Sequence, residues 1–154
     1  MMNFKKLQKE IDSISYQNII FIGLGNPIRG DDGAGLELIE QLEKRHTFQG
    51  AHFIKGHTTP ENYLVKITQQ NPELVVFVDT ARMNKKPGDI SEIQSDLIDS
   101  KGFSTHTYSM KLIEDYLTSN GVSKIKYIGI EPKTTEISNT ISAEVQEGIN
   151  RFFN

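Results

Sequence analysis

The stretch Ile19-Ile-Phe-Ile-Gly-Leu-Gly-Asn-Pro-Ile-Arg-Gly-Asp-Asp-Gly-Ala-Gly35 decides the fold of this chain. Its opening run of β-branched and aromatic residues predicts a strand that is buried on both faces, as in a parallel sheet. The glycines and Pro27 then stop the strand and allow the backbone to turn sharply. Asp31 and Asp32 fall near the start of an amphipathic segment. The stretch therefore predicts a strand, a loop and a helix in succession.

A dinucleotide site is disfavoured by the same stretch. The Rossmann loop requires Gly-x-Gly-x-x-Gly, and here Gly23 and Gly25 fit but Ile28 stands in the third position. The two carboxylates would also repel a pyrophosphate at the helix N-terminus. Taken alone, Asp31 and Asp32 are better explained as a cap and a dipole partner of that helix, with a cap contributing about 1 kcal/mol.

Composition excludes several classes of protein. The 154 residues suffice for one domain with a substantial core, and the net charge of -3 gives no basic field for nucleic acid. The absence of cysteine excludes disulfides, thiolate metal sites and a cysteine nucleophile. No apolar run reaches the length of a membrane span, and the N-terminus lacks the apolar centre of a signal peptide. We therefore expect a cytoplasmic protein without nucleic-acid or membrane partners.

Strand and helix patterns alternate along the chain. The clearest strand pattern, residues 74–78, stops abruptly at Asp79, and further strand patterns cover residues 19–22, 51–55, 90–93 and 125–130. Helical patterns cover residues 33–44, 60–67 with Thr59 as N-cap, 110–120, and a final stripe from Ile141 to Phe152. This alternation predicts an α/β fold with a mainly parallel sheet of about five strands, helices on both faces, and residues 90–93 at an edge. We expect residues 1–17 to form a helical extension and residues 18–154 a single α/β domain.

Three side chains form a candidate metal site. Ligands of doubly wound sheets bind at the carboxyl ends of the strands. Asp32 follows the first strand, Asp79 ends a central one, and His106 lies in a loop before a helix. Two carboxylates and an imidazole suit a borderline divalent ion such as nickel or zinc. Taken alone, His106 is better explained as a loop histidine, and His57 is kept as a reserve ligand or substrate contact.

Several motifs together resemble one family. They are Gly23-Leu-Gly-Asn26, Gly30-Asp-Asp-Gly-Ala-Gly35, Val76-Phe-Val-Asp-Thr-Ala81 and Ser104-Thr-His106. In this order they resemble the hydrogenase maturation endopeptidases, which remove a C-terminal peptide from the large subunit of nickel–iron hydrogenases. Thr58-Thr-Pro-Glu-Asn62 and Gly129-Ile-Glu-Pro132 are similar to the formate-hydrogenlyase-type branch. The resemblance extends from about Asn18 to the C-terminus.

The resemblance implies a three-layer α/β/α sandwich and a nickel-sensing, aspartyl-type endopeptidase. The family's acidic and histidine ligands match Asp32, Asp79 and His106, which become the expected catalytic and metal-binding residues. The nickel is presented by the precursor, so no tightly bound resident metal is expected. The partner implied is a large-subunit precursor. One departure is the loop Lys55-Gly-His-Thr58, where the family often has Asp-Gly-Gly-Thr, and it leaves substrate choice open.

Two other functions stay open at this point. The segment Gly23-Leu-Gly-Asn-Pro27 also resembles the opening of bacterial peptidyl-tRNA hydrolases, but the sequence continues with Ile-Arg-Gly-Asp-Asp and the chain is acidic. A non-catalytic metal-binding accessory module would keep the same three ligands and cleave nothing. A cleavage assay separates that module from a protease.

Overall fold

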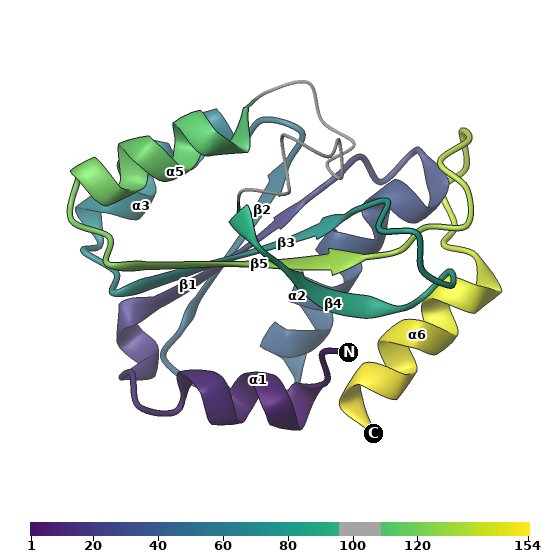
Figure 1. The fold of residues 1–154 in the computed structure, drawn as a ribbon, viewed down its shortest axis with the longest axis horizontal. Helices are drawn as coiled ribbons and strands as arrows, with labels where there is room; N and C mark the ends of the chain where they lie inside the picture. Colours follow the sequence, from purple (N-terminus) through teal and green to yellow (C-terminus); the bar gives the residue numbers. More distant parts are fainter. Residues whose placement is uncertain (96–108) are drawn as a thin grey trace.

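A five-stranded sheet forms the middle layer of the computed structural model, which describes residues 1–95 and 109–154 (Figure 1). The strands lie in the order β2-β1-β3-β5-β4. Four of them are parallel: β1 (Ile19–Leu24), β2 (His52–His57), β3 (Leu74–Thr80) and β5 (Lys124–Ile130). The fifth, β4 (Ile90–Ile93), pairs antiparallel with β5 and forms the predicted edge. The expectation of a mainly parallel sheet is confirmed.

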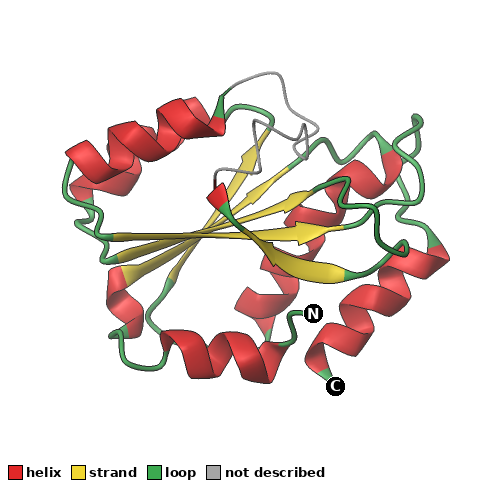
Figure 2. Ribbon diagram, viewed as in Figure 1, coloured by secondary structure: helices red, strands yellow, loops and turns green. Residues whose placement is uncertain are grey.

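Helices cover both faces of this sheet, as Figure 2 shows. One face carries α1 (Phe4–Ile11), α2 (Ala34–Lys44) and α6 (Ala143–Phe153), and the other carries α3 (Leu64–Gln69) and α5 (Met110–Ser119). Short 3-10 turns, η1 (Tyr16–Asn18), η2 (Gly30–Gly33) and η3 (Pro60–Tyr63), precede β1, α2 and α3. The fold is therefore the three-layer α/β/α sandwich that the resemblance implied.

The interior strand β1 shows why its run of apolar residues predicted burial on both faces. Ile19 and Phe21 face the layer of α1, α2 and α6, while Ile20 and Ile22 face the layer of α3 and α5. Every residue of β1 is buried. A strand with helices over both faces needs apolar side chains at consecutive positions, because successive residues point to opposite faces.

The N-terminal segment packs onto the core as α1. The Asn3 side chain caps this helix by accepting a hydrogen bond from the Lys6 N–H at 2.9 Å. Leu7 and Ile11 are fully buried, and the Phe4 ring lies 5.3 Å from that of Phe48. Burial of these side chains stabilises the contact by roughly 1.5–3 kcal/mol for each large apolar group. The segment thus adds to the apolar layer beneath the sheet.

An ion-pair cluster joins α1 to the edge of the sheet. The Lys126 ammonium lies 2.9 Å from a carboxylate oxygen of Glu10 on α1 and 3.1 Å from one of Glu92 on β4. Burial of the ammonium lowers the pKa of Lys126, but hydrogen bonds to the two carboxylates outweigh it and the pKa rises above 10.5. The charged form of Lys126 therefore favours the docked position of α1.

Two helix starts differ from the prediction. Thr59 occupies the predicted N-cap position before Pro60, but it caps the 3-10 turn η3 without a side-chain hydrogen bond, and α3 begins only at Leu64. Ile141 precedes the last helix, which Ser142 caps by accepting a hydrogen bond from the Val145 N–H at 3.3 Å. Apolar spacing locates a buried stripe but not the residue at which helical hydrogen bonding begins. Among the described helices, none has the length and apolar character that a membrane crossing requires.

Candidate active site

Asp32 lies in the turn between β1 and α2. The Asn26 N–H donates to the Asp32 carboxylate at 2.8 Å, and the side chain is only 6% exposed. Gly25 makes this geometry possible: it has φ of 133°, and a Cβ there would lie 1.8 Å from the Asp32 carbonyl oxygen. A residue with a side chain would therefore push the turn away from the strand end. The loop holds the Asp32 carboxylate at the carboxyl end of β1.

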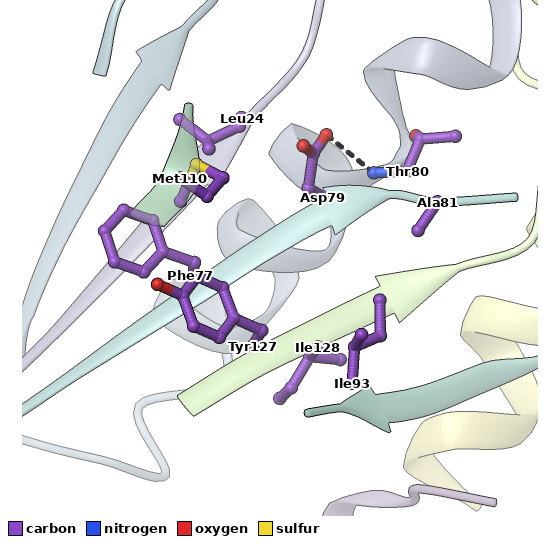
Figure 3. Close-up of a pocket in the computed structure, with 9 residues that line it drawn as sticks. All are labelled: Leu24, Phe77, Asp79, Thr80, Ala81, Ile93, Met110, Tyr127 and Ile128. Carbon is purple, nitrogen blue, oxygen red and sulfur yellow. Dashed lines mark hydrogen bonds between the residues drawn. The ribbon is translucent and has the colours of Figure 1, made fainter. Parts of the chain in front are cut away.

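Asp79 stands at the carboxyl end of β3, next to β1. Its carboxylate accepts a hydrogen bond from the Thr80 N–H at 2.7 Å, drawn as a dashed line in Figure 3. The side chain is half-buried and borders an apolar pocket. The residues lining this pocket are Leu24, Phe77, Asp79, Thr80, Ala81, Ile93, Met110, Tyr127 and Ile128. Asp79 thus places a carboxylate at the rim of a mostly apolar recess.

Gly35 allows the two acidic segments to approach each other. A Cβ at this position would lie 2.5 Å from the Val78 carbonyl oxygen and 3.1 Å from the Asp79 Cα. Such distances are far inside van der Waals contact, so only glycine lets the first turn of α2 rest directly on the end of β3. Asp32, in the turn after β1, and Asp79, at the end of β3, therefore lie at the same edge of the sheet.

Asp31 has a different role from the one predicted. It does not cap α2, because neither η2 nor α2 has a side-chain cap. Its carboxylate instead accepts hydrogen bonds from the N–H groups of Lys133, Thr134 and Ser142 at 2.8, 3.1 and 2.7 Å, and from the Ser142 hydroxyl at 2.9 Å. Asp31 is completely buried. It anchors the loop after β5 and the start of α6 to the turn that carries Asp32.

Backbone pairing reinforces this anchor. The Gly30 N–H donates to the Ser138 carbonyl at 2.8 Å, and the Ser138 N–H donates to the Ile28 carbonyl at 3.0 Å. Lys133, in the same loop, forms an ion pair with Glu144, and a hydrogen bond to that carboxylate raises the pKa of Lys133. The loop over residues 133–142 is therefore fastened at several points to the turn that carries Asp32.

Glu131, which follows the predicted strand 125–130 and belongs to the motif Gly129-Ile-Glu-Pro132, proves to be a second buried anchor. It is 6% exposed, and its carboxylate accepts hydrogen bonds from the N–H groups of Met83 and Lys85 at 2.7 and 3.0 Å. It thereby holds the loop that follows β3 and Asp79. The signal that could have identified it is an acid directly after an apolar strand, the same signal that singled out Asp79.

Of the two histidines singled out in the sequence, the structure describes His57. His57 ends β2 with φ of 53°, and its carbonyl accepts a hydrogen bond from the Gly25 N–H at 2.8 Å. Its side chain is exposed and borders a second pocket with Pro27 and Glu37, separate from the recess beside Asp79. His106 lies outside the described residues. Within residues 1–95 and 109–154, no three carboxylate or imidazole side chains are grouped as a metal site.

The described donors still suit a divalent ion in part. Carboxylate oxygens and an imidazole bind borderline metals such as nickel, and two carboxylates alone leave several coordination positions open. The arrangement defines a class of protein: an α/β sandwich with a carboxylate site at the carboxyl edge of its sheet.

Comparison with known proteins places the chain within that class. The sequence model of the HycI hydrogenase maturation protease family matches residues 36–154. The chain therefore belongs to the hydrogenase maturation protease family, and it is a peptide hydrolase.

Individual relatives and solved structures support this family membership. The hydrogenase 3 maturation protease of Escherichia coli K12 is 29% identical over 114 residues, which are 73% of this chain and 72% of that protein. The crystal structure of the [NiFe] hydrogenase maturation protease HycI from Thermococcus kodakarensis superposes with a TM-score of 0.81 at 26% identity, covering 94% of this chain and 92% of that one. The solution structure of the endopeptidase HycI from Escherichia coli gives 0.75 at 25% identity, with 86% and 84% covered. The peptidyl-tRNA hydrolase and accessory-module alternatives are set aside by this membership.

Proposed function

We propose that this protein removes the C-terminal peptide from the large-subunit precursor of a nickel–iron hydrogenase after nickel has been inserted. The nickel is part of the substrate, and Asp32, Asp79 and His106 recognise it there. The proposed compartment is the cytoplasm, which fractionation of the producing cells checks. The observation that carries the proposal is the placement of Asp32 and Asp79 at the same edge of the sheet in a chain of this family.

The proposed chemistry is hydrolysis of one peptide bond. The oxygen of a water molecule bonds to the scissile carbonyl carbon, the C–N bond breaks, and the water's protons end on the new amine and carboxyl groups. The chain contains no cysteine to act as a covalent nucleophile. Asp32 and Asp79 provide the carboxylates that bind the nickel-bearing substrate and relay a proton. The shortened subunit and the free peptide are the products.

Purified protein mixed with nickel-loaded and nickel-free precursor tests this proposal. Only the nickel-loaded precursor is expected to be shortened, and Asp32→Asn or Asp79→Asn should abolish or severely slow the cleavage. Asp115→Asn is the matched control, since it makes the same chemical change on the exposed side of α5. Equal cleavage of both precursors would refute nickel sensing, and unimpaired cleavage by Asp79→Asn would refute the assignment of that carboxylate.

A further inference from the structure

Thr80 is bonded to both acidic segments of the candidate site. It is the last residue of β3 and is completely buried. Its N–H holds a carboxylate oxygen of Asp79 at 2.7 Å. Its hydroxyl donates to the carbonyl oxygen of Asp31, also at 2.7 Å. Thr80 therefore connects the end of β3, which carries Asp79, to the turn that carries Asp31 and Asp32.

The bond to the Asp31 carbonyl acts directly on Asp32. The carbonyl of Asp31 and the N–H of Asp32 belong to one planar peptide unit, which moves as a rigid body. The far side of that plane is held as well, because the Asp32 N–H donates to the Arg29 carbonyl at 3.1 Å. With both ends fixed, the Cα of Asp32 has a defined position relative to β3.

We infer that Thr80 is a positioning residue that sets the separation and orientation of the Asp32 and Asp79 carboxylates. The inference rests on the proposed function, in which those carboxylates engage the substrate. Thr80 itself touches no substrate. A valine would fill the same space and keep the β-branch, but it would release the Asp31–Asp32 peptide from the end of β3.

A pair of substitutions separates positioning from packing. Thr80→Val keeps the volume and loses the hydroxyl, whereas Thr80→Ser keeps the hydroxyl and loses a methyl group. If Thr80 positions the carboxylates, Thr80→Val should lower kcat/KM for nickel-loaded precursor by about 100-fold, because misplacement of roughly 1 Å has an effect of that size. Thr80→Ser should retain activity to within about threefold. Thr118→Val is the matched control, since the Thr118 hydroxyl also donates to a backbone carbonyl, that of Glu114 at 3.0 Å, but on α5.

Amide hydrogen exchange supplies a readout that does not depend on activity. The Asp32 N–H should exchange at least tenfold faster in Thr80→Val than in Thr80→Ser, measured where circular dichroism shows both variants folded. Wild-type cleavage rates in folded Thr80→Val, or equal Asp32 exchange in the two variants, would overturn the inference. Lack of cleavage by the wild-type protein would instead refute the proposed function, and the exchange comparison would still decide the role of Thr80.

Discussion

Replacing Asp31 with asparagine is expected to destabilise the fold far more than replacing its neighbour Asp32. The Asp31 carboxylate accepts hydrogen bonds from three backbone N–H groups and one hydroxyl, all in the segment 133–142. An asparagine keeps one acceptor oxygen and turns the other into a donor. Whichever way the amide lies, its NH2 group faces at least one backbone N–H that loses its acceptor.

The size of the effect follows from those contacts. A buried donor left unsatisfied costs about 1–3 kcal/mol, and the hydrogen bonds that remain lose the strengthening given by a charged acceptor. Together these losses destabilise the fold by roughly 3 kcal/mol, which for a domain of this size lowers Tm by about 6–12 °C. A helix cap at the same residue would have contributed only about 1 kcal/mol.

Thermal unfolding without substrate measures the difference. Asp31→Asn should melt well below the wild type. Asp32→Asn should melt closer to it, because the amide oxygen can still accept the Asn26 N–H, so that this hydrogen bond is weakened rather than lost. Processing should show the reverse order for any variant that is still folded. If Asp31→Asn melts within about 2 °C of the wild type, or Asp32→Asn proves the less stable of the two, the anchoring role of Asp31 is wrong.

Three further outcomes are expected. Gly35→Ala should lower the free energy of unfolding, measured with urea, by about 1–3 kcal/mol, because the alanine Cβ would lie 2.5 Å from the Val78 carbonyl oxygen. A urea midpoint equal to that of the wild type would show that α2 can shift to make room for the methyl group. The pKa of Lys126 is raised above 10.5 in the fold, so the ion pairs of its ammonium stabilise the fold fully below that pH, and this stabilisation is lost as pH rises through the folded pKa. Lys126→Met should therefore lose less stability than the wild type when pH is raised into this range. The same dependence of stability on pH in both proteins would contradict this. Adding a chelator should leave the Tm of the protein nearly unchanged. Added nickel should bind the wild type weakly and the His106→Ala variant more weakly still. A stoichiometric resident metal whose removal by chelator unfolds the protein would contradict a metal presented by the substrate.

Much of the fold could be predicted because its signals are local. The apolar runs of β1 and β3 arise from burial on both faces, and the abrupt change to Asp79 marks the end of β3. The stripe of α6 arises from packing on one side of a helix. These patterns repeat within a few residues, so the sequence displays them directly.

The different roles of Asp31 and Asp32 could not be predicted from the sequence. The two residues are identical and adjacent, and their side chains diverge because η2 turns one toward the interior and leaves the other near Asn26. The partners that select Asp31 lie more than 100 positions away along the chain. The Thr80 hydroxyl bond spans 49 positions and leaves no local pattern either. The catalytic and metal-binding roles of Asp32, Asp79 and His106 stay predictions.

The order of the strands has a consequence for how the protein is made. β3 lies between β1 and β5, but β5 is synthesised well after β3, and β4 can pair only once β5 is present. Until residues 124–130 leave the ribosome, the apolar strand β3 presents an open edge of unpaired N–H and C=O groups. Nascent or truncated chains that stop before β5 are therefore exposed to edge-to-edge association and to capture by chaperones. Residues 124–154 therefore protect the sheet as well as completing it.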